Sequence, residues 1–307
     1  MGDWSKASLP AEVFRVGGPD VMWTEFVSAD GLFLGGKDAL LRDLSFTESE
    51  RPIVAQFFTA HPDMMRRAAA LALALGFDGV DINMGCPDRT IEKQGAGAAL
   101  MKNPALAREL VAAAKEGTEE KIPVSIKTRL GYNKIELETW LPSLLLTNPA
   151  AIIIHARTRK EMSKVPARWE YIKRAVEIRN AAKSDTFIVG NGDVMALSEA
   201  RACVTETGAD GVMLGKAIFG NPWLFDEGKG EVSREEKLRM AVEHTKLFED
   251  FFKDTKNFAI MKKHYKVYVH GWDGAKELRG KLMEARSADE VAQTVEAFLK
   301  SSKATVL

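Results

Sequence analysis

Several polar residues of this chain stand where an apolar, strand-like segment ends. Apart from a single thiol, each of them is a hydrogen-bond donor. In chain order they are Gln56, Asn83, Cys86, Lys127, Arg129, His155 and Arg157. The set has neither paired carboxylates nor a cluster of metal-ligating residues, so we expect no metal at this site. Donors gathered around one thiol suit a polar, ring-shaped cofactor and a reaction that needs a proton.

The position of Cys86 is unusual for a structural thiol. It lies between Gly85 and Pro87, directly after an apolar run that begins at Gly79, whereas a structural thiol would more naturally lie inside such a run. A thiol has a reference pKa of about 8.5, so at neutral pH it is mostly protonated and can donate a proton. We therefore interpret Cys86 as a candidate catalytic acid. Cys203, the other cysteine, lies in a helical pattern and is expected in a core.

Two glycine-bearing segments end the last two strand-like runs: "GNGD" (Gly190–Asp193) and "GK" (Gly215–Lys216). A (β/α) barrel commonly binds phosphate there through backbone N–H groups, and Lys127 would add a fixed positive charge. Together these features predict a phosphorylated cofactor with a hydrogen-bonding ring system, for which flavin mononucleotide (FMN) is the obvious candidate. Taken singly, "GNGD" is more typical of a turn, and a lone Gln, Lys or His of a structural residue. Their joint placement at successive strand ends favours a site.

Strand-like runs alternate with helical patterns along most of the chain. The runs are Val21–Ser28, Ile53–Phe58, Gly79–Gly85, Val124–Leu130, Ala151–Arg157, Phe187–Asp193 and Gly211–Lys216. Most are nearly continuous in apolar residues, as expected for parallel strands covered on both faces. The repeated unit predicts a TIM (β/α)₈ barrel, with a doubly wound sheet as the competing architecture. We favour the barrel because polar residues recur at the carboxyl ends of many strands.

The two ends of the chain depart from this repeat. The segment before Val21 contains no apolar strand of its own, so the first strand of the barrel is either missing or degenerate. From Arg234 onwards only helical periods remain, which predicts a small all-helical domain. The expected division is a barrel over residues 1–232 and a helical domain over residues 233–307.

The composition indicates a soluble protein. Lys and Arg total 43, as do Asp and Glu, and this balance neither favours nor excludes a nucleic-acid partner. Two cysteines cannot form a disulfide framework, which indicates a reducing compartment. The N-terminal residues have no apolar region typical of a signal peptide, and no apolar run is long enough to cross a bilayer. We therefore expect a cytoplasmic protein, and a monomer.

The stretch "DINMGCPDRTIEKQGAGAALM" (Asp81–Met101) resembles the tRNA-dihydrouridine synthases, flavoenzymes that reduce uridine in tRNA. The similarity continues in matching order and spacing through "TEFVSADGL", "AQFF", "IKTRLGY", "IHARTR", "GNGDV" and "GVMLGKAIFGNPWLF". The "DIN-x-GCP" element is highly specific, whereas the other segments are weak when taken alone. The helical C-terminal region also resembles the second domain of that family.

The resemblance implies a TIM barrel that carries FMN, draws on NADPH or NADH, and acts on tRNA. In such an enzyme hydride passes from flavin N5 to uracil C6 while an acid protonates C5. Cys86 takes the place of that acid, and Asn83 falls where the base is contacted. The positions that match flavin contacts are Gln56, Lys127, His155, Asn191, Gly192, Asp193, Gly215 and Lys216. We expect Arg129 and Arg157 to have a supporting role in binding flavin or RNA, and we expect Lys93 to lie beside the nucleotide.

Two departures from the family pattern concern the flavin. Family members begin with a strand that ends in an "APM"-like segment packed against the flavin, whereas this chain starts with "MGDWSKASLPAEVFR". A lost strand would leave the second and eighth strands with unpaired edges. Lys216 and Ala217 stand where Arg-Gly is usual, and lysine keeps the charge but loses the bidentate fork.

Basic residues near the C-terminus favour an RNA partner. From Lys253 to Lys281 eight basic residues oppose three acidic ones, with Tyr265, Tyr268 and Trp272 interleaved. Charge alone is equally consistent with a solvated helix face above core aromatics, but the barrel motifs favour a phosphate-contacting surface. Two alternatives to a dihydrouridine synthase stay open. One is an FMN barrel that reduces a free pyrimidine or a small enone and has no need of a basic tail; the other is a catalytically impaired tRNA-binding homologue.

Overall fold

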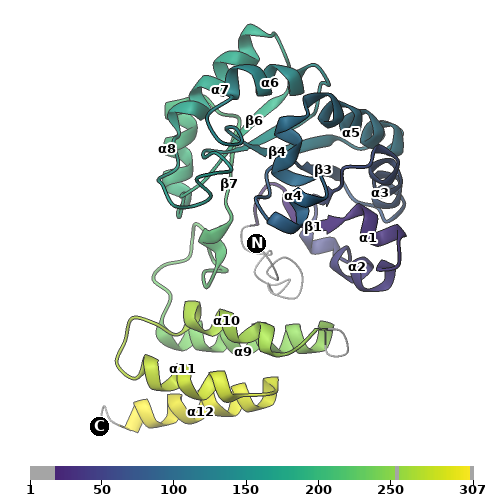
Figure 1. The fold of residues 1–307 in the computed structure, drawn as a ribbon. Coiled ribbons are helices and arrows are strands. Elements are labelled where there is room, and N and C mark those ends of the chain that lie inside the picture. Colours follow the sequence, from purple (N-terminus) through teal and green to yellow (C-terminus); the bar gives the residue numbers. More distant parts are fainter. Residues whose placement is uncertain (1–17, 253–255, 305–307) are drawn as a thin grey trace. The chain divides into compact units, whose positions relative to one another are not determined.

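The computed structural model describes residues 18–252 and 256–304 (Figure 1). The described chain forms two compact units, one spanning Asp20–Ala217 and one that starts at Ile218. The division expected between residues 232 and 233, with its assignment of a catalytic and an RNA-binding domain, stays a prediction. The expected loss of the first strand concerns residues that lie almost entirely outside the described ranges.

A seven-stranded, all-parallel sheet with its strands in sequence order forms the frame of the first unit. The strands are β1 (Met22–Ser28), β2 (Ile53–Phe58), β3 (Gly79–Asn83), β4 (Val124–Arg129), β5 (Ala151–His155), β6 (Phe187–Asn191) and β7 (Gly211–Met213). Every strand expected from the sequence is present. Within the described part of the chain β1 and β7 do not pair with each other, so the seven described strands form a partial barrel.

Helices alternate with these strands, and α3, α5, α7 and α8 pack against the sheet (Figure 1). The helices of this unit are α1 (Ala29–Phe33), α2 (Lys37–Asp43), α3 (Pro62–Ala74), α4 (Arg89–Lys93), α5 (Pro104–Gly117), α6 (Leu137–Leu145), α7 (Glu170–Ala181) and α8 (Leu197–Thr207). Three short 3₁₀ segments are η2 (Glu48–Glu50), η3 (Gly97–Lys102) and η4 (Lys216–Ile218). Helices α3 and α5 begin with proline at a position where the missing N–H has no intrahelical partner in any case.

The core of this unit explains why its strands are apolar almost throughout. Ile82 and Ile126 are fully buried in neighbouring strands, and Ile152 is fully buried in the next. These residues pack between the sheet and its covering helices, so a polar residue within these strands is costly unless it is hydrogen-bonded. The buried polar residues of the strands therefore need an explanation.

The second unit is entirely helical in its described part, as the sequence predicts. Its helices are α9 (Arg234–Phe252), α10 (Ala259–Tyr268), α11 (Ala275–Glu284) and α12 (Ala288–Ala304). Leu238, Phe248 and Leu282, with residues of α12 such as Val291, form its own hydrophobic core. Among the described residues, no helix of either unit is both long and apolar enough to span a bilayer.

Candidate active site at the carboxyl ends of the strands

The register of the sheet brings the predicted polar residues together. Gln56 lies beside Asp81, Asn83 beside Lys127, and His155 beside Asn191. Parallel strands in register direct alternate residues to the same face, so side chains far apart in the sequence meet at one end of the sheet. Side-chain hydrogen bonds between these strands bear out that placement.

A buried chain of hydrogen bonds runs from Asp81 to the backbone of Cys86. Gln56 Nε2 donates to Asp81 Oδ2 at 2.7 Å, and Asn83 Nδ2 donates to Gln56 Oε1 at 3.1 Å. Asn83 Oδ1 then accepts the backbone N–H groups of Gly85 at 3.1 Å and Cys86 at 2.9 Å. Asp81, Gln56 and Asn83 are 0%, 4% and 6% exposed. Asn83 thus holds the turn that carries the thiol.

Asp81 is not among the residues predicted from the sequence, although it lies two residues before Asn83 and so on the same face of β3. Burial raises the pKa of Asp81 to about 6, while hydrogen bonds from Ser125 and Gln56 and the charge of Lys127 oppose this rise. Ser125 Oγ donates to Asp81 Oδ1 at 2.5 Å. The carboxyl is therefore mostly ionised at neutral pH, in a site closed to water.

Cys86 is half-buried at the mouth of β3. Its carbonyl oxygen accepts the N–H of Ala98 at 2.9 Å, and Gly97 packs so closely that a Cβ there would lie 2.8 Å from that oxygen. Burial raises the pKa of the thiol above its ordinary value, so the thiol stays protonated at neutral pH. Lys127 and Arg129 are close enough to interact with it electrostatically. The environment is that of a fixed proton donor.

Lys127 supplies a positive charge inside the predicted cluster. Burial, with a smaller effect from Arg129, lowers its pKa to about 8, so the ammonium form still predominates at neutral pH. Lys127 Nζ donates to Asn191 Oδ1 at 3.3 Å, and Asn191 Nδ2 donates to the carbonyl oxygen of Met213 at 2.8 Å. These bonds link β4, β6 and β7 at the end of the sheet where the candidate cofactor residues lie.

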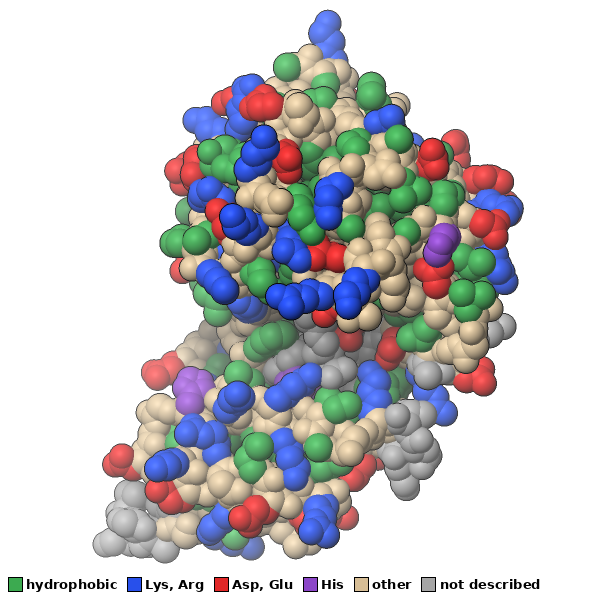
Figure 2. Space-filling model, in the orientation of Figure 1, with side chains coloured by type: hydrophobic (Ala, Val, Ile, Leu, Met, Phe, Trp, Pro, Cys, Tyr) green, Lys and Arg blue, Asp and Glu red, His purple; other side chains and the backbone are tan. Residues whose placement is uncertain are grey.

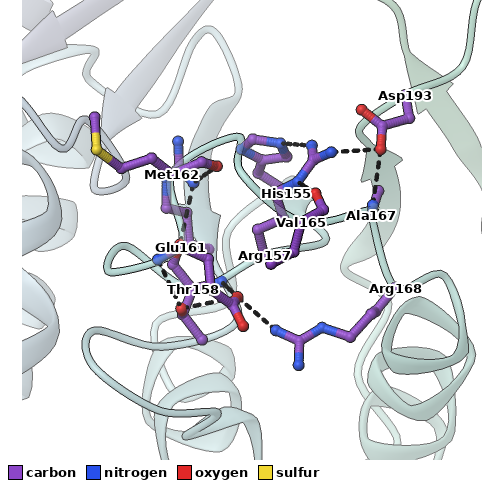
Figure 3. Close-up of polar contacts among 10 residues, drawn as sticks. His155, Arg157, Thr158, Glu161, Met162, Val165, Ala167, Arg168 and Asp193 are labelled. Atoms are coloured by element: carbon purple, nitrogen blue, oxygen red, sulfur yellow. Dashed lines mark hydrogen bonds and ion pairs between the residues drawn. The ribbon is translucent and has the colours of Figure 1, made fainter.

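Arg157 fixes the protonation and orientation of His155 (Figure 3). Its Nη1 donates to His155 Nε2 at 3.0 Å, its Nε donates to the carbonyl oxygen of Val165 at 2.5 Å, and its Nη2 pairs with Asp193. Burial and the nearby cations lower the pKa of His155 to about 2, so the ring is neutral. Since Nε2 accepts, Nδ1 carries the proton and can donate it. The Arg157 contact also lowers the pKa of Asp193 below its usual range.

Arg129 ties the Cys86 turn to the loop after β5. Its Nε donates to the carbonyl oxygen of Gly85 at 2.8 Å, and its Nη1 donates to those of Thr158 at 3.3 Å and Met162 at 3.0 Å. Burial lowers its pKa to about 10, so it remains charged. These contacts, like those of Arg157, position neighbouring groups; their expected role towards flavin or RNA stays a prediction.

The remaining predicted residues lie at or beyond the strand ends. Gly192 packs on His155, because a Cβ there would lie 3.1 Å from His155 Cδ2. Gly215 follows β7, and Lys216 opens η4 with an exposed side chain. Lys93 ends α4 and is also exposed. The predicted roles of these residues in binding flavin or nucleotide are consistent with their places but are not tested by them.

An ion pair that was not predicted from the sequence connects α4 to the loop after β5. Arg159 Nε donates to Glu92 Oε1 at 2.7 Å, and a second bond joins the same two side chains. The Glu92 side chain is only 8% exposed. The ring centroid of Tyr132 lies 5.0 Å from the Arg159 guanidinium and 4.0 Å from the Lys102 ammonium. These contacts hold the loop that follows Cys86 against the loops after β4 and β5.

On α10 of the helical unit, the two tyrosines are buried whereas two of the lysines are exposed. Tyr265 and Tyr268 are fully buried in the core, which supports the core interpretation for these two. Lys263 and Lys266 on α10 are exposed, and Arg279 Nη1 donates to a backbone carbonyl at 2.7 Å. Lys253 lies outside the described residues. A surface that contacts phosphate would thus depend on the lysines and not on stacking by these tyrosines.

A structural comparison supports the barrel. Histamine dehydrogenase from Rhizobium sp. 4-9 superposes with a TM-score of 0.54 at 14% identity, over 80% of this chain and 48% of that one. The chain therefore spans about half the length of that protein. At this identity the similarity shows the fold alone.

The sequence comparisons identify the family. The family model described as "Dihydrouridine synthase (Dus)" matches residues 1–303. "Probable tRNA-dihydrouridine synthase 2" of Bacillus subtilis is 38% identical over 289 residues, covering 93% of this chain and 88% of that protein. "Probable tRNA-dihydrouridine synthase" of Staphylococcus epidermidis is 36% identical over 283 residues, covering 91% and 86%. With a family match over nearly its whole length, this chain belongs to the dihydrouridine synthase family.

Proposed function

We propose that this protein is an FMN-dependent tRNA-dihydrouridine synthase, which reduces the C5–C6 double bond of uridines in tRNA. Family membership over residues 1–303 supports the activity. The observation that carries the residue assignments is the placement of Cys86, a half-buried and protonated thiol held beside converging hydrogen-bond donors. NADPH or NADH is the proposed source of reducing equivalents.

The donor set fits a flavin. A flavin ring system presents carbonyl oxygens and ring nitrogens that need fixed donors, and Gln56, Lys127 and the neutral His155 converge at one end of the sheet. Its phosphate needs backbone N–H groups and a cation, which the segments at Gly192 and at Gly215–Lys216 can provide. These residues would hold FMN, whose reduced form supplies the hydride.

Cys86 would supply the proton. Its thiol is mostly protonated at neutral pH because burial raises its pKa. Asn83 holds the Cys86 N–H and Arg129 holds the Gly85 carbonyl oxygen, so the turn is restrained on both sides of the thiol. Asn83 Nδ2 carries a second hydrogen besides the one given to Gln56, and this one can contact the target base.

tRNA is the proposed partner of both units, and the cytoplasm is the proposed location. Figure 2 shows Lys and Arg side chains over both units, with a row of them along one rim of the strand-bearing unit. Such cations can neutralise RNA phosphates, so we expect binding to weaken steeply with salt. A uridine in folded tRNA must leave its stack to reach Cys86, at a cost of a few kcal/mol.

We expect the protein to act as a monomer. The test uses purified protein supplied with FMN, together with NADPH and an unmodified tRNA that carries the target uridine. Dihydrouridine is measured by nucleoside mass spectrometry for the unchanged protein and for Cys86→Ala. We expect dihydrouridine from the unchanged protein and at least about 100-fold less from the variant, with NADPH still reducing its flavin. Unreduced tRNA despite normal NADPH oxidation would contradict the substrate assignment, and full activity of Cys86→Ala would remove the thiol from its role.

The same experiment addresses the two alternatives. Reduction of a free pyrimidine or a small enone with a kcat/KM above that for tRNA would favour a small-molecule reductase. A protein without flavin absorbance that nevertheless binds tRNA would favour a catalytically impaired homologue.

A further inference from the structure

We propose that Asp81 is a positioning residue that acts through Gln56 and Asn83 to hold the Cys86 thiol in place. This inference rests on the proposed function, because it assigns Asp81 a part in the work of Cys86. The influence of Asp81 passes to the thiol along three consecutive hydrogen bonds, from a carboxylate to two amides to a backbone N–H.

The direction of each bond follows from the one before it. An ionised carboxylate can only accept, so Gln56 must turn its Nε2 towards Asp81. Gln56 Oε1 is then left facing Asn83, which must donate with its Nδ2. Asn83 Oδ1 in turn faces the N–H groups of Gly85 and Cys86 and accepts both. The direction of the series is therefore set at both ends, by Asp81, which can only accept, and by the two backbone N–H groups, which can only donate.

Two amides alone would not hold this arrangement as firmly. An amide presents a donor and an acceptor of nearly the same shape, so a Gln–Asn pair can run in either direction. In the reverse direction Asn83 would present Nδ2 to the N–H groups of Gly85 and Cys86, and donors would face donors. The backbone N–H groups disfavour this reverse direction from one end of the series, and the carboxylate disfavours it from the other, so the fully paired network specifies one arrangement more firmly.

The burial of Asp81 argues that it has such a role. Its neighbours in β3, Val80 and Ile82, are as fully buried as Asp81 itself. Placing a carboxylate there costs free energy, and an apolar residue of similar volume would serve the core at least as well. The raised pKa of Asp81 reports the same cost. What an apolar residue could not provide is the acceptor that orients Gln56.

The turn has a second, independent restraint, which limits the expected effect. Arg129 donates to the Gly85 carbonyl oxygen and does not depend on Asp81. Loss of the Asp81 acceptor should therefore loosen the Cys86 turn without releasing it completely. The half-buried thiol would become more accessible, and its pKa would fall towards the ordinary value as burial lessens.

Four variants separate orientation from simple loss of contact. Asp81→Ala removes the acceptor, and Gln56→Met removes both amide links while keeping the side-chain size. Asp81→Asn keeps an oxygen for Gln56, and its new amide group can donate to the Ser125 hydroxyl. Ser125→Ala removes the 2.5 Å hydrogen bond from the Ser125 hydroxyl to the other oxygen of the Asp81 carboxylate. It leaves the three hydrogen bonds that lead from Asp81 to the Cys86 backbone intact.

The readout is the rate at which iodoacetamide alkylates Cys86 in the FMN-supplied protein, compared at equal flavin occupancy. Peptide mass spectrometry reports Cys203 on α8 in the same sample as an internal reference. We expect Asp81→Ala and Gln56→Met to raise the ratio of Cys86 to Cys203 rates by about fivefold or more. Asp81→Asn and Ser125→Ala should stay within about twofold of the unchanged protein.

An unchanged Cys86 rate in folded Asp81→Ala or Gln56→Met would overturn the inference, as would an Asp81→Asn rate equal to that of Asp81→Ala. If Asp81→Ala does not fold, Gln56→Met decides. Dihydrouridine formation should be slower in Asp81→Ala, and in Asp81→Asn it should stay closer to that of the unchanged protein. An unchanged protein that leaves tRNA uridine unreduced would refute the proposed function and leave the alkylation result standing.

Discussion

Replacing Gly97 by alanine should displace the backbone of Cys86. Gly97 has a φ of +60°, and a Cβ there would lie 2.8 Å from the Cys86 carbonyl oxygen and 2.9 Å from Ile91 Cγ2. The oxygen cannot turn away freely, because it accepts the Ala98 N–H at 2.9 Å. Ile91 is buried and has little room to move. The strain therefore falls on the turn that presents the thiol.

Gly95 offers a matched control on the same loop. Its φ is +80°, but a Cβ there would meet only Ala60 Cβ, at 3.3 Å. Both alanine variants place a side chain in left-handed backbone, at a cost of about 1–2 kcal/mol. Gly97→Ala adds overpacking of about 1–3 kcal/mol. We expect Gly97→Ala to lower the free energy of unfolding by about 2–5 kcal/mol and Gly95→Ala by about 1–2 kcal/mol.

The catalytic effect should separate the two variants more strongly than the stability effect. A misplacement of about 1 Å can cost about 100-fold in rate. We expect Gly97→Ala to slow single-turnover dihydrouridine formation by about 10- to 100-fold and Gly95→Ala by less than about threefold. Urea unfolding gives the stabilities, and rapid quench with nucleoside mass spectrometry gives the rates. A folded Gly97→Ala protein with an unchanged rate would refute the argument that the backbone of Cys86 must be held.

Three further predictions follow from the charged groups. Burial gives Asp81 a folded-state pKa of about 6 against an ordinary 3.8, so the folded state binds the extra proton and stability falls as pH rises through this interval. The unfolding free energy of Asp81→Asn relative to the unchanged protein should therefore increase by about 1–3 kcal/mol from pH 4 to pH 7 in urea titrations. Lys127→Met should weaken FMN binding about tenfold in fluorescence titrations. The melting temperature should not fall, because desolvation of the half-buried ammonium group itself costs free energy. Tighter FMN binding would contradict this prediction. Glu92→Gln should lower the free energy of unfolding by about 1–3 kcal/mol, whereas Glu119→Gln, from an exposed pair with Lys121, should leave the melting temperature unchanged.

The strands and their polar ends could be predicted because their signal is local. A nearly continuous apolar run such as Ile152–Ile154 marks a strand buried on both faces, although β5 ends at His155, two residues before the expected end at Arg157. The end of β7 was placed too late: the strand stops at Met213 and not at Lys216. Only β6 pairs with β7 in the described chain, so fewer ladder bonds extend it.

The contacts between side chains could not be predicted because they depend on which strands become neighbours. Arg157 and Asp193 are 36 residues apart, and Arg159 and Glu92 are 67 apart. No spacing rule links such positions until the sheet order is known. Asp81 is a different case, since a carboxylate inside an apolar run, two residues before Asn83, is a visible signal of a buried polar network.

The restraints on Cys86 and the residues predicted to bind the flavin phosphate belong to different parts of the sheet. The thiol is held from β3 and β4, by Asn83 and Arg129, and these strands have paired neighbours on both sides. Lys216 follows β7, whose other edge has no partner strand among the described residues. A change at that edge should therefore affect the flavin without affecting the thiol. We expect Lys216→Ala to weaken FMN binding about tenfold while the alkylation rate of Cys86 in the flavin-free protein stays within about twofold. If both quantities change together, the two parts of the site are coupled and the separation argued from the strand order is wrong.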